Sequence, residues 1–257
     1  MDLSLKAFNS FDGTKISYSD FGQGRPVILL HAFIIDSILN WHETAIAEQI
    51  RSMGRRVICP DFRGHGNSDK PHDANAYSDQ AMARDIIELL DFLELEHVDL
   101  VGYSMGSAVA IQVAARDTRI DSLVLGGTGT GEWSEWDAEN RREEIESLRD
   151  AAPADPGFYR QIVDSEEGDR LAVAARLEGD QFPQFTRETV ESVEIPVCVI
   201  NGRDDMESPQ VLASVFPHGT SKTCEGDHIS AIWSPDFAEA IVGALNWAAH
   251  GNPCTSC

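Results

Sequence analysis

The chain has 257 residues, of which 42% are hydrophobic and 25% charged, an ordinary composition for a soluble globular protein. Twenty basic against 43 acidic residues give a net charge of −23, which disfavours nucleic acid and anionic membrane surfaces as partners. No apolar run reaches the ~20 residues of a membrane helix, and the first residues lack a signal-peptide pattern, so we expect a cytoplasmic protein.

The predicted elements begin with two strand-like runs, 3–8 and 15–21, which are separated by the turn signal FDGT and predict an antiparallel hairpin. From residue 26 onward strand-like and helix-like segments alternate, which predicts a mostly parallel sheet with helices on both faces. The further strands, which bring the sheet to eight, are expected at 26–31, 56–61, 98–103, 121–127, 196–202 and 221–226. Helices are expected at Leu39–Met53, Ser78–Leu95, Met105–Arg116, Pro209–Phe216 and Pro235–His250.

Residues 129–194 interrupt this alternation, because they contain no convincing strand. Three helix-like segments replace it, at 134–150, 156–165 and 168–180. We therefore expect an α/β core built from residues 1–128 and 195–257, with 129–194 forming a small helical lid rather than a separate domain.

Polar side chains follow three of the predicted parallel strands. Ser104 comes directly after 98–103, Asp204 and Asp205 follow 196–202, and His228 follows 221–226. Because ligands bind beyond the carboxyl ends of parallel strands, we expect these side chains at one rim of the sheet. Serine needs a neighbouring base to become a nucleophile, and a carboxylate behind the histidine would orient that base.

Five motifs occur in order along the chain: LLHAF, DFRGHGNSDKP, GYSMG, GRDDMESP and GDHISA. With them the chain resembles the α/β-hydrolase fold superfamily, and specifically its small lidded esterase- and haloperoxidase-like members. The resemblance covers nearly the whole chain and implies a nucleophile at Ser104 and a base at His228. It favours Asp205 over Asp204 as the acid, since the family's acid usually lies three residues after the strand-ending glycine, here Gly202.

The resemblance also implies an oxyanion hole made by the backbone N–H groups of Met105 and Phe33. Here the sequence departs from the commonest pattern, because Ala32 stands where glycine is usual. If that position required a left-handed backbone, alanine would cost about 1–2 kcal/mol. His31 and His65 lie in family motifs and are expected to be structural.

Substrate contacts are expected from apolar side chains near this rim, for which the alternative is ordinary core or lid packing. We assign Ile34, Tyr103, Trp133 and Trp136 to this group, and together they would favour an apolar acyl group.

The resulting hypothesis is a serine hydrolase that cleaves carboxylic esters of small, apolar acyl groups through an acyl-enzyme. The same triad would serve carbon–carbon bond hydrolysis, lactone opening or perhydrolysis, and the scaffold would also suit a ligand-binding or signalling protein with slow turnover. We expect a small-molecule ester as substrate, neither nucleic acid nor membrane as a partner, a monomer or homodimer, and no metal or organic cofactor. The five cysteines predict neither a disulfide framework nor a zinc site, because the terminal C-x-x-C lacks a second pair.

Overall fold

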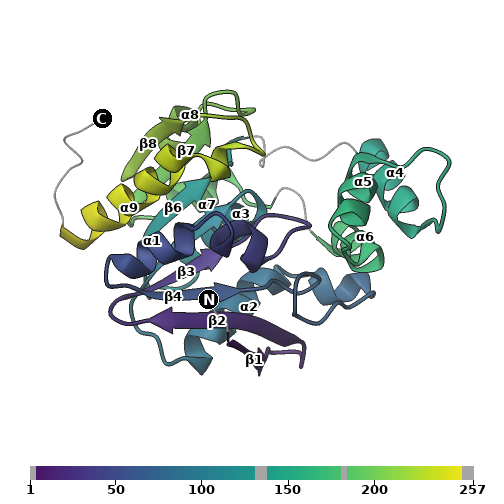
Figure 1. Ribbon diagram of the computed structural model, residues 1–257, viewed down its shortest axis with the longest axis horizontal. Coiled ribbons are helices and arrows are strands. Elements are labelled where there is room, and N and C mark those ends of the chain that lie inside the picture. The colour runs from purple at the N-terminus through teal and green to yellow at the C-terminus, as the bar shows by residue number, and fades with distance from the viewer. Residues whose placement is uncertain (1–3, 131–137, 181–183, 251–257) are drawn as a thin grey trace.

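The computed structural model describes residues 4–130, 138–180 and 184–250, with one sheet at its centre (Figure 1). The eight strands are ordered β1-β2-β4-β3-β5-β6-β7-β8. β1 pairs with β2 and β2 with β4 in antiparallel fashion, and all other pairs are parallel. The strands are β1 Leu5–Asn9, β2 Lys15–Gly22, β3 Pro26–Leu30, β4 Arg56–Pro60, β5 Val98–Tyr103, β6 Ile120–Gly126, β7 Val197–Gly202 and β8 Gly219–Cys224. The predicted mostly parallel eight-stranded sheet is confirmed.

Helices cover both faces of this sheet. On one face lie α1 (Ile46–Ser52) and α9 (Pro235–His250), and on the other lie α2 (Ala81–Phe92), α3 (Met105–Ala114) and α8 (Pro209–Ala213). Val27 and Leu29 of β3 pack towards the first group, and Ile28 and Leu30 pack towards the second. Such double coverage explains why the inner strands β3 to β7 are apolar without alternation.

One predicted helix is interrupted. The segment expected at 39–53 forms a π-helical turn, Ile38–His42, and then α1, with Ala45 between them at φ 60°. Such a left-handed residue ends the first turn and starts α1 in a new direction. The turn buries Asn40 and Trp41, and Asn40 accepts a hydrogen bond from the loop that follows β3.

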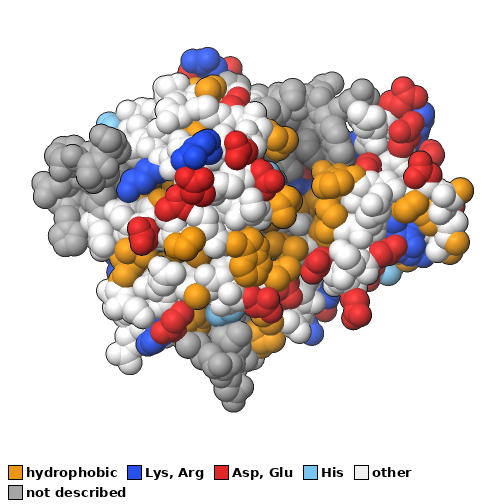
Figure 2. Space-filling model, turned by 45° about the horizontal axis from the view of Figure 1, so that its top comes forward, with side chains coloured by type: hydrophobic (Ala, Val, Ile, Leu, Met, Phe, Trp, Pro, Cys, Tyr) orange, Lys and Arg blue, Asp and Glu red, His pale blue; other side chains and the backbone are white. Residues whose placement is uncertain are grey.

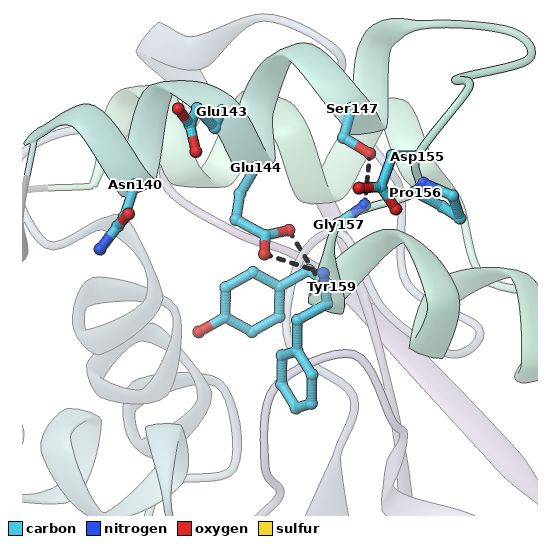
Figure 3. A pocket seen from close by; sticks show the side chains of 9 residues that line it. Asn140, Glu143, Glu144, Ser147, Asp155, Pro156, Gly157 and Tyr159 are labelled. Carbon is cyan, nitrogen blue, oxygen red and sulfur yellow. Dashed lines mark hydrogen bonds between the residues drawn. The ribbon is translucent and has the colours of Figure 1, made fainter.

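Three helices of the predicted lid region form a group at one side of the sheet, as Figure 1 shows: α4 (Ala138–Arg149), α5 (Phe158–Ser165) and α6 (Arg170–Gly179). We call these three helices the insertion. The Glu144 carboxylate of α4 accepts the backbone N–H groups of Phe158 (2.9 Å) and Tyr159 (3.1 Å), so a negative charge stands at the start of α5 (Figure 3). The insertion is therefore tied together by polar contacts as well as by its own hydrophobic cluster.

A fourth helix of the 129–194 region, α7 (Arg187–Glu191), was not predicted. Its Val190 and the following Val193 are buried in the main core, and the helix packs against α3. The structure thus places residues 187–193 with the sheet and its covering helices, and α4–α6 apart from them.

The sheet ends in two polar edge strands. β1 is mostly exposed and carries Lys6, and β8 is largely polar and carries Lys222. Within the described ranges no helix is both long and apolar enough to cross a lipid bilayer. Figure 2 shows hydrophobic side chains gathered where the insertion meets the rest of the molecule.

Candidate active site

Ser104 occupies a sharp turn between β5 and α3. Its backbone has φ 50° and ψ −116°, a strained conformation for a residue with a side chain. Gly102 and Gly106 make the turn possible. A Cβ at Gly102 would overlap the backbone of Gly106, and one at Gly106 would lie 2.6 Å from the carbonyl carbon of Leu30. The strain therefore holds the Ser104 side chain away from both elements, at the carboxyl end of the sheet.

The structure brings Ser104, His228 and Asp205 together. Ser104 Oγ lies 3.0 Å from His228 Nε2, and His228 Nδ1 lies 3.2 Å from Asp205 Oδ1. A carboxylate only accepts hydrogen bonds, so the Nδ1 atom carries the proton and Nε2 is left to accept the serine hydroxyl. Asp205 has a buried side chain, whereas Asp204 is exposed. The geometry favours Asp205 as the acid, as the motif spacing does.

The loop that carries His228 is held from two sides. The Tyr103 hydroxyl donates to the His228 backbone oxygen at 2.7 Å, and burial raises the pKa of Tyr103, which keeps this donor protonated. Asp227 accepts the backbone N–H groups of Ile229 (3.1 Å) and Ser230 (2.8 Å). Asp227 is thus a loop-forming residue. Tyr103, which we expected to contact substrate, is buried against Phe237 of α9 and supports the histidine instead.

The loop after β3, residues 31–37, lies on the other side of Ser104's turn; we call it the β3 loop. His31 donates from Nδ1 to the Ala32 oxygen (2.7 Å) and accepts the Phe62 N–H at Nε2 (2.9 Å). Both ring nitrogens are therefore occupied, and burial lowers the pKa of His31, which makes it a neutral structural residue. The Ala32 N–H donates to Asn40 Oδ1 at 2.8 Å.

The left-handed residue of the β3 loop is Ile34 (φ 74°), not Ala32. The alanine therefore carries no such strain, and the expected penalty falls two residues later. A left-handed β-branched residue costs about 1–3 kcal/mol. The Ile34 side chain is buried in the hydrophobic cluster of the insertion, and burying such a side chain contributes about 1.5–3 kcal/mol. The two effects are comparable in size.

The N–H groups expected to form the oxyanion hole lie on either side of this arrangement. Met105 is the first residue of α3, where helix N–H groups lack intrahelical acceptors. Phe33 stands in the β3 loop between Ala32 and Ile34. Neither N–H has a hydrogen-bond acceptor among the residues that the structure describes.

Residues 25–178 match the family model described as the alpha/beta hydrolase fold. The chain belongs to the α/β-hydrolase fold family. It is 28% identical over 256 residues to 3-oxoadipate enol-lactonase 2 of Acinetobacter baylyi, with 90% of this chain and 92% of that protein covered. It is 28% identical over 226 residues to the 2-hydroxy-6-oxo-2,4-heptadienoate hydrolase of Pseudomonas putida, with 77% and 78% covered. A thermophilic esterase from Thermogutta terrifontis superposes with a TM-score of 0.78 at 23% identity, with 95% and 99% of the two chains covered.

In this α/β hydrolase, His65 lies near the site without joining the three aligned residues. Its Nδ1 donates to the Arg63 oxygen at 3.0 Å, and its buried Nε2 has no partner among the described residues. Burial lowers the pKa of His65 well below the usual value. Its ring packs edge-on against Phe33, with 5.8 Å between the ring centroids. His65 is therefore a neutral packing partner of the β3 loop.

The remaining predicted residues of this α/β hydrolase divide into two groups. Trp133 and Trp136 lie outside the residues that the structure describes. Ile34 faces the insertion and lines a cavity of about 460 Å³, whose other walls include residues 64–67, the α5–α6 connection 166–169 and Val173 of α6. Sequence patterns carried no signal for the Tyr103–His228 bond or for this placement of Ile34. Among the described residues, no cluster of three or more histidine, cysteine or acidic side chains is arranged to hold a metal ion.

Proposed function

We propose that this α/β hydrolase cleaves carboxylic esters of small, apolar acyl groups through a covalent acyl-enzyme. The observation that carries the proposal is the continuous hydrogen-bond chain from Ser104 through His228 to Asp205. Such a chain lets a weak nucleophile lose its proton at the moment it attacks.

In the first half of the reaction, His228 Nε2 takes the proton of Ser104 Oγ, and the oxygen attacks the ester carbonyl. The N–H groups of Met105 and Phe33 hold the negative oxygen of the tetrahedral intermediate. His228 then gives its proton to the departing alcohol, which leaves the acyl group on Ser104. Asp205 stabilises the imidazolium ion during this exchange.

In the second half, a water molecule takes the place of the alcohol. His228 accepts a proton from the water as the water oxygen attacks the acyl carbonyl. The second tetrahedral intermediate uses the same two N–H groups, and its collapse returns the proton to Ser104 and releases the carboxylic acid.

Apolar side chains beside the reacting residues support the choice of acyl group. Met206 follows Asp205 and is 87% exposed, and Ile229 follows His228 and is 67% exposed. Exposed apolar side chains of this size beside polar reacting groups favour an apolar substrate surface.

A cyclic ester is the second candidate substrate. A curated relative that aligns over 90% of this chain is an enol-lactonase, and lactone opening uses the same attack on an ester carbonyl. The two candidates differ in the leaving group, which stays attached to the acyl part in a lactone.

The test is hydrolysis of p-nitrophenyl esters from acetate to decanoate by the wild type and by Ser104→Ala. We expect multiple turnovers in the wild type, fastest on short chains, and a loss of about 10³-fold or more in the variant. Hydrolysis of a series of γ- and δ-lactones, measured by pH-stat titration, tests the cyclic esters in the same way. Turnover that survives in Ser104→Ala would exclude the proposed nucleophile, and a wild type inactive on both series would exclude ester hydrolysis.

A further inference from the structure

Two residues of the β3 loop pack against the insertion, and one of them, Phe33, packs against the main core as well. Ile34 shares a buried cluster with Leu148 of α4, Val163 of α5 and Val173 of α6. Phe33 is partly buried at the margin of the same cluster. Figure 2 shows the junction where hydrophobic side chains of the two parts gather. The loop next to Ser104 is thus continuous with the core of a group of helices that begins more than 100 residues later.

The ring of Phe33 is held between the insertion and the sheet. The guanidinium carbon of Arg176, from α6, lies 4.3 Å from the ring centroid, and the ring of Tyr159, from α5, meets it edge-on at 5.2 Å. His65 contacts it from the side of the core. Arg176 is buried and ion-paired with Asp180 at 2.8 Å, so its stacking position is fixed.

The backbone conformation of Ile34 depends on this packing. Its φ of 74° is one that isoleucine adopts rarely, because the branched Cβ crowds the backbone. A strained residue persists only where its surroundings determine it, and here the surroundings are the side chains of α4, α5 and α6. Without these contacts Ile34 would relax to negative φ, which would rotate the Phe33–Ile34 peptide and displace Phe33.

We propose that the insertion sets the geometry of the oxyanion hole, with Ile34 as the positioning residue that transmits it to the Phe33 N–H. This inference rests on the function proposed above, in which that N–H holds the negative oxygen. The insertion would then act in the chemical step itself and not only as a cover. Because negative charge develops on the oxygen only as the tetrahedral intermediate forms, and is absent from the bound ester, the effect falls on kcat rather than on KM.

The decisive variant is Ile34→Ala, which removes the anchor and leaves the triad untouched. Loss of a whole oxyanion donor costs about 10²–10³ in kcat, so we expect displacement of one to lower kcat about 10- to 100-fold. KM for p-nitrophenyl butyrate should stay within about threefold. The inhibition constant of a butyl trifluoromethyl ketone, whose serine adduct places an oxygen anion in the hole, should rise by the same factor as kcat falls.

Matched variants separate this role from general destabilisation. Ile50→Ala makes the same truncation at a fully buried residue of α1, in a hydrophobic cluster that includes no residue of α4, α5 or α6, and should leave kcat unchanged. Ile34→Val keeps most of the buried side chain and should retain kcat within about fivefold. This variant provides the test if Ile34→Ala does not fold. Ile34→Gly frees the backbone but lacks the anchor, so its kcat should fall like that of Ile34→Ala.

Amide hydrogen exchange of residues 31–37, followed by mass spectrometry, gives a readout independent of turnover. Ile34→Ala should exchange faster there than the wild type, and Ile50→Ala should not. Unchanged exchange, or a raised KM with unchanged kcat, would overturn the proposal. Faster exchange in a chain whose wild type cleaves no ester would instead reject the proposed function while keeping the coupling of the insertion to the β3 loop.

Discussion

The sharpest test of the Ser104 turn is Gly106→Ala. The added Cβ would overlap the carbonyl oxygen of Leu30, and it would lie 2.6 Å from the Leu30 carbonyl carbon and 2.8 Å from the carbonyl oxygen of His31. All three atoms belong to backbone, which cannot swing aside as a side chain does. Moving the Leu30 carbonyl carbon alone from 2.6 Å to an ordinary contact of 3.4 Å requires α3 and β3 to separate by at least about 0.8 Å, and the overlapping oxygen requires more.

This separation should lower both the stability of the fold and the catalytic rate. Overpacking a tight interior costs about 1–3 kcal/mol and occasionally more, and contact with two backbone atoms places this case at the upper end. For a chain of this length, 3 kcal/mol lowers Tm by about 6–12 °C. Because α3 starts directly after Ser104 and carries the Met105 N–H, an ångström-scale shift of the reacting groups also lowers kcat about 10²-fold.

The measurement is thermal unfolding by circular dichroism together with p-nitrophenyl butyrate hydrolysis. Gly243→Ala is the matched control, since it adds the same methyl group inside α9. The nearest atom there is the mobile Nζ of Lys222 at 3.3 Å, so a gain of about 0.5–1 kcal/mol from helix propensity is expected. If Gly106→Ala melts within about 2 °C of the wild type and keeps its kcat, the packing argument for this turn is wrong.

Three further predictions concern the residues around Ser104. Asp205→Asn should lower kcat about 10²- to 10⁴-fold in the same ester assay, whereas Asp204→Asn should stay within about twofold; equal losses would contradict the assignment. Tyr103→Phe removes the bond to His228 and should lower kcat about 3- to 10-fold with KM unchanged, and a variant with wild-type kcat would remove Tyr103 from this role. Because burial depresses the pKa of His65, the unfolded chain alone gains that proton below about pH 6.5. The free energy of unfolding should therefore fall by up to about 1.4 kcal/mol per pH unit towards pH 5. Urea titrations of His65→Gln should show a smaller fall over the same pH range than the wild type, and an equal fall in the two proteins would contradict this prediction.

Much of the fold was predictable because the local signals are strong and agree with one another. Each of the inner strands β3 to β7 is a short apolar run, and double coverage by helices makes such runs nearly continuous. Once the sheet is known to be mostly parallel, the positions of these three residues follow, since Ser104 comes directly after β5, and Asp205 and His228 come a few residues after β7 and β8. The exact partners of these residues still required three-dimensional coordinates.

The rest depends on contacts between distant parts of the chain. The break at Ala45 leaves the apolar periodicity of 39–53 almost intact, so the sequence shows one helix where the structure has two elements. Ile34 has low intrinsic preference for a left-handed backbone, and only its packing against α4–α6 accounts for it. Tyr103 is 125 positions from His228, and no local pattern indicates that its hydroxyl reaches that backbone oxygen.

The chain contains only four lysines, and two of them lie on the edge strands of the sheet. These are Lys6 on β1 and Lys222 on β8, and each stands where the sheet's backbone ladder ends. Charged edges discourage another chain from extending the sheet, and the net charge of −23 keeps copies apart over longer distances. Molar salt shortens that long-range repulsion to about 3 Å, and acetylation removes the amine charges. The edge lysines and the net negative charge therefore both oppose aggregation. Aggregation through the edge strands should require high salt and lysine acetylation together.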